Sequence, residues 1–215
     1  MQWHTLRLGR ITSTTAHALM SKARKAGEMS SALKTEYYRI KAERNLTEDC
    51  KADPTDYLER TAVSSASMEW GKAYEGKARE VHAFATDLSA SEVGFVTHDQ
   101  YSDYWGDSVD GLLTDTATGE IVGCLEIKCP KTATFQEYYD RLIVDKEPLK
   151  AVEPKYYWQV INHLSVCDFV SFCDFVIFDP MHRKGYGYVR IRREDVQEDI
   201  DALTEAVKEF IGKLD

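Results

Sequence analysis

The chain has 215 residues and a formal net charge of −9, with 43% hydrophobic and 29% charged residues. This length and composition exclude a disordered or fibrous chain and predict a single domain, residues 1–215, with a full hydrophobic core. A uniformly acidic surface would repel nucleic acid, so a function on DNA requires the positive charges to be gathered in one place.

The cysteines and the hydropathy pattern indicate the cellular compartment in which the protein is expected. The five cysteines are odd in number, scattered and without a C-x-x-C pair, which indicates reduced thiols. No signal peptide is visible, and the most hydrophobic stretch, residues 169–178, is interrupted by Asp174. We therefore expect a soluble, cytoplasmic protein.

Hydrophobic periodicity predicts alternating helices and strands. In chain order we expect helices over 14–22 and 31–46, a loop over 49–56, a helix over 68–86, a strand over 92–98, a hairpin over 109–128, helices over 132–144 and 154–166, strands over 169–178 and 187–192, and a helix over 194–214. This order is typical of an α/β fold. No internal repeat or clear linker interrupts it.

The predicted hairpin contains two carboxylates. Residues 109–115 and 120–128 flank a turn-rich segment at 116–119, so the chain reverses there. The reversal would bring Asp110 back beside Glu126. Two carboxylates that close repel each other, and one would take up a proton unless a cation shares the site.

A lysine completes this group. Glu126 and Lys128 are separated by one apolar residue, so on a strand they share a face while Ile127 enters the core. Oxygen ligands favour a hard ion, which predicts Mg²⁺, with Mn²⁺ able to substitute, rather than Zn²⁺. The alternative is a surface hairpin with an ordinary exposed salt bridge. Asp110, Glu126 and Lys128 alone do not separate the two interpretations.

Further motifs occur in a fixed order along the chain. They are Trp-His-x-Leu-Arg-Leu-Gly-x-Ile-Thr at 3–12, Trp-Gly-Lys-x-Tyr-Glu at 70–75, Ser-x-Asp-Gly-Leu at 108–112, Leu-Glu-x-Lys-Cys-Pro at 125–130, Tyr-x-x-Gln-Val at 156–160 and Asp-Pro at 179–180. With these motifs the chain resembles the lambda-phage-type alkaline exonucleases, the viral recombinase branch of the PD-(D/E)xK nuclease superfamily. The resemblance implies a restriction-endonuclease-like core, a central mixed β-sheet flanked by helices. Val109 stands where the family usually has proline, a departure that affects backbone shape rather than chemistry.

The resemblance adds ligands to the expected metal site. It implies that Glu75 is directed at the metal together with Asp110 and Glu126, and that the backbone carbonyl of Ile127 is a further ligand. By spacing alone, Glu75 would instead form an intrahelical ion pair with Arg79, four residues later.

Other catalytic roles are implied for residues of the helix over 154–166. In the family, Tyr156 and Gln159 support the active-site lysine and the attacking water, and the lysine here is Lys128. By its apolar surroundings alone, Gln159 would be a buried and satisfied amide. His163, one turn further on, has no matching role and is assigned a structural one.

The N-terminal motif contributes to an expected 5′-phosphate pocket. The resemblance implies that Arg7, Thr14 and Ser108 hold the terminal phosphate, through a guanidinium fork and two hydroxyl groups. The family has serine at the Thr14 position, and Ser13 is an alternative donor. By spacing alone, Thr14 would cap a helix and Arg7 would be a solvated charge.

Three further positions are assigned to DNA contacts. The family pocket has an arginine where this chain has Thr134, so we predict that Lys131 supplies the missing charge. Arg24 aligns with an arginine that reaches into the minor groove, and Met68 with an apolar wedge that separates the terminal base pairs. Without the resemblance, Arg24 would be a solvated charge and Met68 a core side chain.

The charge pattern is compatible with DNA only if it is segregated. Basic residues gather at 22–25, 72–79 and 182–193, and acidic residues at 43–56 and 194–205. Each basic cluster could also be a solvated face. An acidic exterior around a basic channel would reconcile the net charge with a DNA substrate.

These observations predict a metal-dependent 5′ to 3′ exonuclease on linear double-stranded DNA, which releases 5′-mononucleotides and leaves a 3′ single strand for recombination by strand annealing. The resemblance implies a homotrimeric ring, a single-strand annealing recombinase as partner, and a phage or prophage gene expressed in a bacterial host. Two alternatives stay open, an endonuclease of the same superfamily and a DNA-binding protein without catalysis. The chain lacks a glycine-rich nucleotide loop, a serine-hydrolase elbow and paired zinc ligands.

Overall fold

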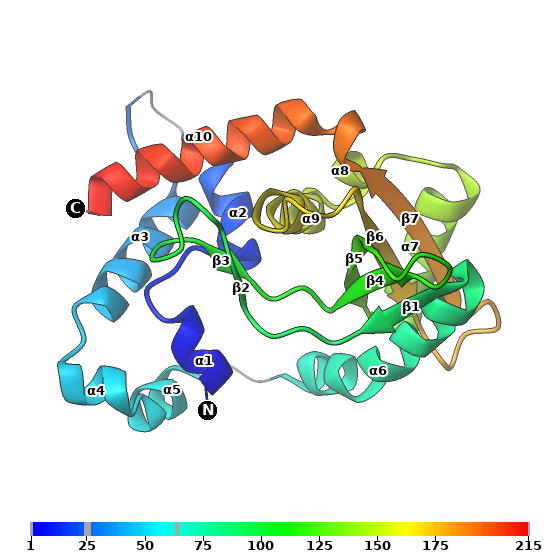
Figure 1. The fold of residues 1–215 in the computed structure, drawn as a ribbon, viewed down its shortest axis with the longest axis horizontal. Coiled ribbons are helices and arrows are strands. Elements are labelled where there is room, and N and C mark those ends of the chain that lie inside the picture. Colours follow the sequence, from blue (N-terminus) through cyan, green and yellow to red (C-terminus); the bar gives the residue numbers. More distant parts are fainter. Residues whose placement is uncertain (1, 24–26, 63–64, 215) are drawn as a thin grey trace.

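The computed structural model describes residues 2–23, 27–62 and 65–214, and its centre is a five-stranded mixed β-sheet (Figure 1). In spatial order the strands are β1 (Leu88–Ser91), β4 (Gly111–Asp115), β5 (Ile121–Lys128), β6 (Phe172–Phe178) and β7 (Tyr186–Arg192). β5 and β6 run parallel, and the other neighbours are antiparallel. A separate small sheet pairs β2 (Val96–Thr97) with β3 (Gly106–Asp107).

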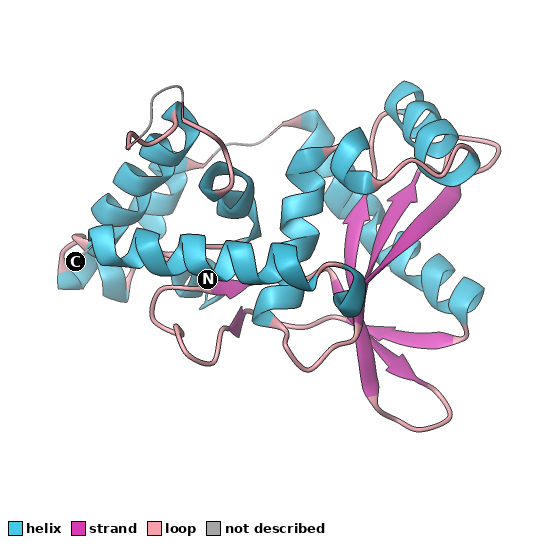
Figure 2. Ribbon diagram, turned by 90° about the horizontal axis from the view of Figure 1, so that it is seen from above, coloured by secondary structure: helices cyan, strands magenta, loops and turns pink. Residues whose placement is uncertain are grey.

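Helices cover both faces of the sheet (Figures 1 and 2). α6 (Ala66–Thr86) packs on one face, and α9 (Pro154–Val166) packs on the other and also contacts β3. α2 (Ser13–Leu19) and α10 (Gln197–Leu214) pack against α9. The remaining helical segments are α1 (Gln2–Arg7), α3 (Ser31–Arg44), α4 (Glu48–Ala52), α5 (Thr55–Thr61), α7 (Thr132–Tyr138), the π-helical η1 (Tyr139–Val144), α8 (Leu149–Val152) and the 3₁₀-helical η2 (Arg193–Asp195).

Strand β5 alternates between two hydrophobic cores, as a period of two requires. Leu125 and Ile127 belong to the core under α6, together with Ala78. Cys124 belongs to the core around α9, and Glu126 points the same way and contacts that helix. The predicted arrangement of this strand is therefore confirmed, with Ile127 in the core and the carboxylate on the opposite face.

Most of the predicted elements are present, and the α/β class is confirmed. The helices expected over 31–46, 68–86 and 154–166 correspond to α3, α6 and α9 within two residues, and the hairpin is formed by β4 and β5. The helix expected over 132–144 is divided into α7 and η1, and the one over 14–22 ends at Leu19.

Two predictions of local structure are wrong. The expected loop over 49–56 is largely helical, because the Thr47 hydroxyl accepts from Cys50 N–H to cap α4, and Pro54 precedes α5, where its missing N–H removes no helix bond. Of the strand expected over 92–98, only the last part forms a strand, β2. The sheet edge comes earlier, because Asp87 adopts a left-handed conformation (φ 57°), ends α6 and leads directly into β1.

Two arginines of the basic cluster at 182–193 stabilise the fold, which corrects the interpretation of that part of the cluster as a solvated face. Arg190 forms two hydrogen bonds of 2.8 Å with buried Asp174, whose Oδ2 lies 3.0 Å from His82. Arg193 donates to backbone carbonyls at the end of α9 and in the following loop, those of Leu164, Cys167 and Val170. These two arginines are therefore paired within the fold rather than freely solvated charges.

Two further features concern the cysteines and the hydrophobicity of the helices. All five cysteines are free. Within the described ranges, the structure contains no helix with both the length and the apolar character that crossing a membrane requires.

Candidate active site

The β4–β5 hairpin brings two carboxylates together where β5 ends. Ile127 N–H donates to Asp110 Oδ2 at 2.6 Å, and Asp110 N–H donates to the Leu125 carbonyl at 3.0 Å. Glu126 is only 4% exposed, and its Oε1 forms an ion pair with Lys128 Nζ. The burial of Glu126 excludes the alternative of an exposed surface salt bridge.

The two carboxylates differ in their affinity for a proton. Burial raises the pKa of Asp110, and the negative charge of Glu126 raises it further, to about 7. Burial also disfavours the charged form of Glu126, but Lys128 and His163 outweigh this effect and lower the pKa of Glu126 to about 2. Lys128 stays charged because Glu126 and Asp110 outweigh its burial and raise its pKa. A cation beside Asp110 would favour the ionised carboxylate.

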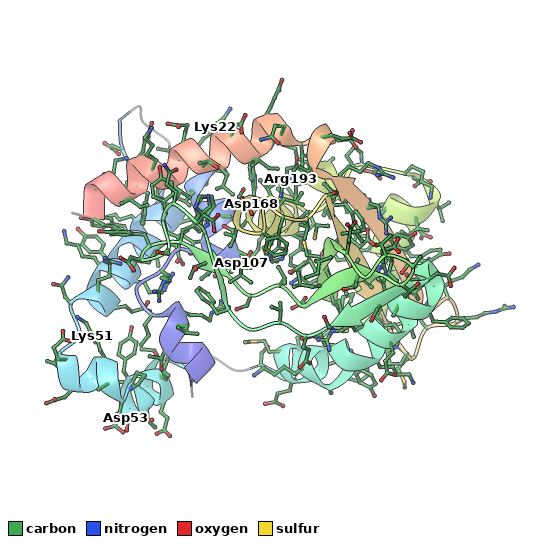
Figure 3. All side chains as sticks on the ribbon, in the orientation of Figure 1. Lys22, Lys51, Asp53, Asp107, Asp168 and Arg193 are labelled. Atoms are coloured by element: carbon green, nitrogen blue, oxygen red, sulfur yellow. The ribbon has the colours of Figure 1, made fainter. Side chains whose placement is uncertain are left out.

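A buried histidine supports Glu126 from α9. His163 Nε2 lies 2.5 Å from Glu126 Oε2, and His163 Nδ1 lies 2.5 Å from Oδ2 of Asp107 on β3 (labelled in Figure 3). Burial opposes the charged imidazole, yet the two carboxylates raise the pKa of His163 well above its usual value. Both ring nitrogens therefore donate. Asn162 Nδ2 also donates to Asp107 Oδ2, at 2.7 Å, which fixes the far end of this chain of contacts.

The sequence analysis assigned His163 only a structural role, without its contact to Glu126, and it missed Asp107. The available signal was the spacing on α9, since His163 is one turn from Gln159 and therefore lies on the same side of the helix. Nothing in the sequence indicated Asp107, which reaches His163 only because the β2–β3 pair packs against α9.

Glu75 lies on α6 and lines the same cavities as Asp110, but its carboxylate is paired with Arg79. Glu75 Oε1 accepts from Arg79 Nη2 at 2.7 Å, and Arg79 Nε donates to the Asp110 carbonyl at 2.8 Å. Burial raises the pKa of Glu75, against the effect of the arginine. The ion pair expected from spacing is thus present. In the part of the chain that the structure describes, no three His, Cys, Asp or Glu side chains are close enough together to hold a metal ion.

The donor atoms that best fit a divalent ion are those of Asp110, Glu126 and the Ile127 backbone. Because the N–H and C=O of one strand residue point to the same side, the Ile127 carbonyl faces the side on which its N–H meets Asp110. Oxygen donors of this kind suit Mg²⁺ or Mn²⁺. Glu75 would join them only after leaving Arg79, or through a bridging water.

One cavity of about 400 Å³ contains both groups of residues singled out from the sequence. Asp110, Glu126, Lys128 and Gln159 line it, and so do the three residues of the expected phosphate pocket, Arg7, Thr14 and Ser108. Ser108 Oγ and Gln159 Oε1 are buried there without a hydrogen-bond partner among the described residues. Unpaired buried polar atoms in a cavity wall indicate a ligand or water that contacts them. The amide oxygen of Gln159 is therefore not satisfied by any residue that the structure describes.

The structure also tests the alternatives for Thr14 and Met68. The N-cap residue of α2 is Thr12, so Thr14 does not cap the helix, and the two hydroxyl oxygens lie 3.0 Å apart. Met68 is 50% exposed and lines a second cavity of about 390 Å³ with Asp110 and Lys128, so it is not a core side chain.

Of the remaining assigned residues that the structure describes, Tyr156 reaches the site and Lys131 does not. Lys128 Nζ lies 4.7 Å from the centre of the Tyr156 ring, so Tyr156 contacts the lysine that it is expected to support. Lys131 lines a third cavity and is not brought together with Arg7 and the two hydroxyl groups. Arg24 lies outside the described residues.

A mixed sheet flanked by helices, with paired carboxylates and a lysine on one hairpin and a glutamine of α9 in the same cavity, defines a nuclease of the restriction-endonuclease-like class. Within that class, the chain belongs to the YqaJ-like viral recombinase family, whose domain matches residues 2–170. The resemblance to viral recombinases predicted from the sequence is confirmed.

Solved structures agree with this family. The alkaline exonuclease LHK-Exo from Laribacter hongkongensis is 26% identical, with a TM-score of 0.74 over 99% of this chain and 91% of that one. The structure of LHK-Exo in complex with dAMP is 27% identical, with the same TM-score and coverage. A phage-related exonuclease from Haemophilus somnus 129PT, 12% identical with a TM-score of 0.61 over 95% of this chain and 94% of that one, shares the fold.

No curated protein sequence matches the chain. The family and the solved structures together support a DNA exonuclease, and related nucleases depend on divalent metal ions.

Proposed function

We propose that residues 1–215 form a single nuclease domain that acts as an Mg²⁺-dependent 5′ to 3′ exonuclease on linear double-stranded DNA. The main supporting observation is that one cavity joins the catalytic group, Asp110, Glu126 and Lys128, to Arg7 and the unpaired hydroxyl of Ser108. Such a cavity can hold a terminal phosphate and the next phosphodiester at the same time. The products are 5′-mononucleotides and a 3′ single strand, which is then available for strand annealing.

The chemistry divides between a metal ion and the side chains. A bound Mg²⁺ would lower the pKa of a water and neutralise charge on the phosphodiester. Lys128, held by Glu126 and Tyr156, positions the attacking water or screens the developing charge, and Gln159 Oε1 accepts a hydrogen bond from that water. Water adds to phosphorus, and the bond from phosphorus to the 3′ oxygen of the terminal nucleotide breaks. The new phosphate stays on the shortened strand.

End recognition distinguishes this proposal from an endonuclease. Arg7 offers a guanidinium fork to the terminal phosphate, Ser108 Oγ lacks a protein partner among the described residues, and Thr14 presents an exposed hydroxyl. An endonuclease that cuts within a strand has no need of a terminal phosphate. Lys131 is not included in this pocket, because it lines a different cavity.

The proposal extends to assembly and partners. We propose a homotrimeric ring around the DNA, with Arg24 in the minor groove and Met68 as the wedge at the duplex end. From the basic cluster at 72–79, Lys72 lines both cavities beside the carboxylates, whereas Arg79 pairs with acidic side chains. A single-strand annealing recombinase would receive the emerging strand in the cytoplasm of a bacterial host, from a phage or prophage gene.

Three DNA substrates test the proposed function. They are a linear duplex with a 5′-phosphate, the same duplex without it and a covalently closed circle, each incubated with Mg²⁺ and with EDTA. We expect Mg²⁺-dependent release of mononucleotides, fastest from the phosphorylated duplex, with the circle untouched. Cleavage of the circle would identify an endonuclease of the same superfamily, and cleavage of none would favour a DNA-binding protein without catalysis.

A further inference from the structure

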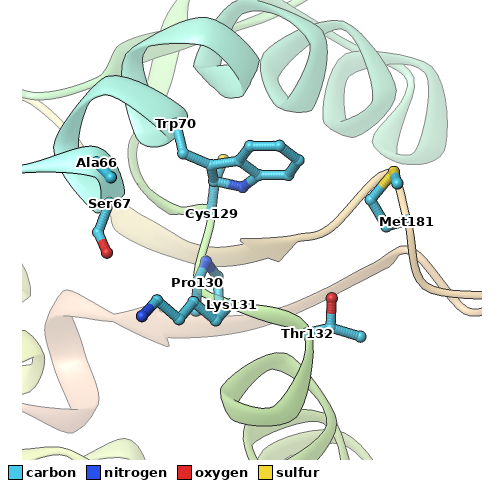
Figure 4. A pocket seen from close by; sticks show the side chains of 8 residues that line it. All are labelled: Ala66, Ser67, Trp70, Cys129, Pro130, Lys131, Thr132 and Met181. Atoms are coloured by element: carbon cyan, nitrogen blue, oxygen red, sulfur yellow. The ribbon is translucent and has the colours of Figure 1, made fainter.

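A cavity of about 280 Å³ lies beside the catalytic cavities and has no role in the proposed function (Figure 4). α6 contributes Ala66, Ser67 and Trp70, the segment between β5 and α7 contributes residues 129–132, and the loop after β6 contributes Met181. Most of these side chains are apolar. A pocket of this kind takes a ligand with a flat, apolar surface.

Trp70 forms the broad wall of this pocket, which we call the Trp70 pocket. Its ring centre lies 4.3 Å from that of Tyr74, a contact that limits movement of the indole. Trp70 Nε1 is buried and has no hydrogen-bond partner in the described part of the chain. Figure 4 shows the nitrogen on the edge of the ring turned toward Pro130. A ligand acceptor that reached this N–H after a small shift of the ring would satisfy it.

The opposite side of the Trp70 pocket combines apolar groups with one cation. Cys129 contributes a half-buried side chain that is not in a disulfide. Pro130 presents its ring, and Met181, which is 75% exposed, offers a polarizable side chain at the edge. Lys131 adds a positive charge. A flat ring with hydrogen-bond acceptors and an attached anion, which describes a nucleotide, matches this set of groups.

The Trp70 pocket adjoins the proposed reaction centre. It shares Ser67, Cys129 and Pro130 with the cavity that contains Asp110 and Lys128. That cavity in turn shares both catalytic residues with the one lined by the phosphate pocket. The catalytic residues therefore lie between the phosphate pocket on one side and the Trp70 pocket on the other.

We propose that the Trp70 pocket binds the nucleobase on the 3′ side of the cleaved phosphodiester, which is the second base from the 5′ end. This proposal rests on the exonuclease function, since a terminal phosphate in the Arg7 cavity fixes the direction of the strand. The base stacks on the Trp70 ring, and Lys131 contacts a neighbouring phosphate. The base must leave its complement to enter, which agrees with Met68 beside Ser67 at the boundary of the two cavities.

The test compares two duplexes that differ only in whether the second position carries a base. Both have a 5′-phosphate, and the second position holds either a mismatched base or an abasic tetrahydrofuran residue, so neither is paired. Release of the first nucleotide is measured in a single turnover with Mg²⁺ at subsaturating DNA. Base stacking on an aromatic side chain predicts that the wild type cleaves the abasic duplex roughly 5- to 150-fold more slowly. An abasic residue at position eight is the control for general damage to the strand.

Variants assign the effect to the pocket. Trp70→Ala is expected to cleave both duplexes at the slow rate of the abasic one, and Trp70→Phe to retain part of the difference through its ring. Met181→Glu changes an exposed side chain without disturbing the interior, and its negative charge should also reduce the difference. Tyr38→Ala, which removes an exposed aromatic residue of α3, is the matched control and should behave as the wild type.

The possible outcomes are distinct. Equal rates on the two duplexes in the wild type, or an undiminished difference in folded Trp70→Ala and Met181→Glu, would overturn the nucleobase pocket while leaving the exonuclease function in place. Failure of the wild type to cleave a fully paired, 5′-phosphorylated duplex would overturn the exonuclease function and this proposal with it.

Discussion

Replacement of Asp110 by asparagine is expected to abolish cleavage and yet stabilise the metal-free protein. Burial and Glu126 raise the pKa of Asp110 from 3.8 to about 7, so the folded protein holds this proton more tightly than the unfolded chain. Stability therefore falls as the pH rises from about 4 to about 7, and is lowest above that range. A rise of this size corresponds to about 4 kcal/mol. Asparagine does not ionise and escapes this penalty, although its oxygen is a weaker acceptor for Ile127 N–H.

Urea unfolding in EDTA, followed by circular dichroism, measures the effect. The free energy of unfolding of Asp110→Asn should exceed that of the wild type by about 2–4 kcal/mol at pH 8.5, and more than half of this advantage should be lost at pH 5. Asp115→Asn is the control of opposite sign, because backbone N–H groups of Thr118 and Ala117 lower the pKa of Asp115. A lower stability of Asp110→Asn than of the wild type at pH 8.5 would refute the reasoning. A difference in free energy of unfolding between variant and wild type that is the same at pH 8.5 and pH 5 would also refute it. Mg²⁺ should stabilise the wild type and not the variant.

Three further changes are predicted. His163→Ala leaves two buried carboxylates without their shared partner and should lower the free energy of unfolding by about 3–5 kcal/mol, against about 0.5 kcal/mol for His182→Ala; equal losses would contradict a special role for His163. Ser108→Ala should reduce the preference in kcat/KM for 5′-phosphorylated over 5′-hydroxyl duplex roughly 10-fold or more, and an unchanged preference would remove Ser108 from the phosphate pocket. Gly123→Ala places a Cβ 2.4 Å from the Phe172 ring and should lower the free energy of unfolding, measured in urea, by about 1–3 kcal/mol. An unchanged free energy of unfolding would show that this contact does not constrain the fold.

The hairpin could be predicted from sequence because its determinants are local. The turn ends at Gly119, whose φ of 75° suits glycine, and the period of two along β5 places Glu126 and Ile127 on opposite faces. The short elements could not be predicted in the same way. β1 consists of four residues whose strand conformation depends on pairing with β4, and α4 depends on one hydroxyl cap. The pairing of β1 with β4 is a contact that no short sequence window contains, whereas the α4 cap between Thr47 and Cys50 is local but is a weaker signal than the periodicity of a long helix.

The site followed the same division between local and distant determinants. Asp110 and Glu126 meet through one turn, so periodicity alone brought them together, whereas Arg7 and Gln159 come from distant elements and were placed only through the family resemblance. His163 shows the limit of that resemblance. A family motif marks side chains that face the substrate. The charge of Glu126, however, is also stabilised by the His163 imidazole, on the side away from the substrate. That imidazole is itself charged because its other nitrogen contacts Asp107. Asp107 immediately precedes Ser108 on the chain. The buried contacts from Asp107 through His163 to Glu126 therefore link the position of the metal-facing carboxylate to that of the proposed phosphate pocket. A substitution at Glu126 should shift Ser108, and a substitution at Ser108 should shift Glu126.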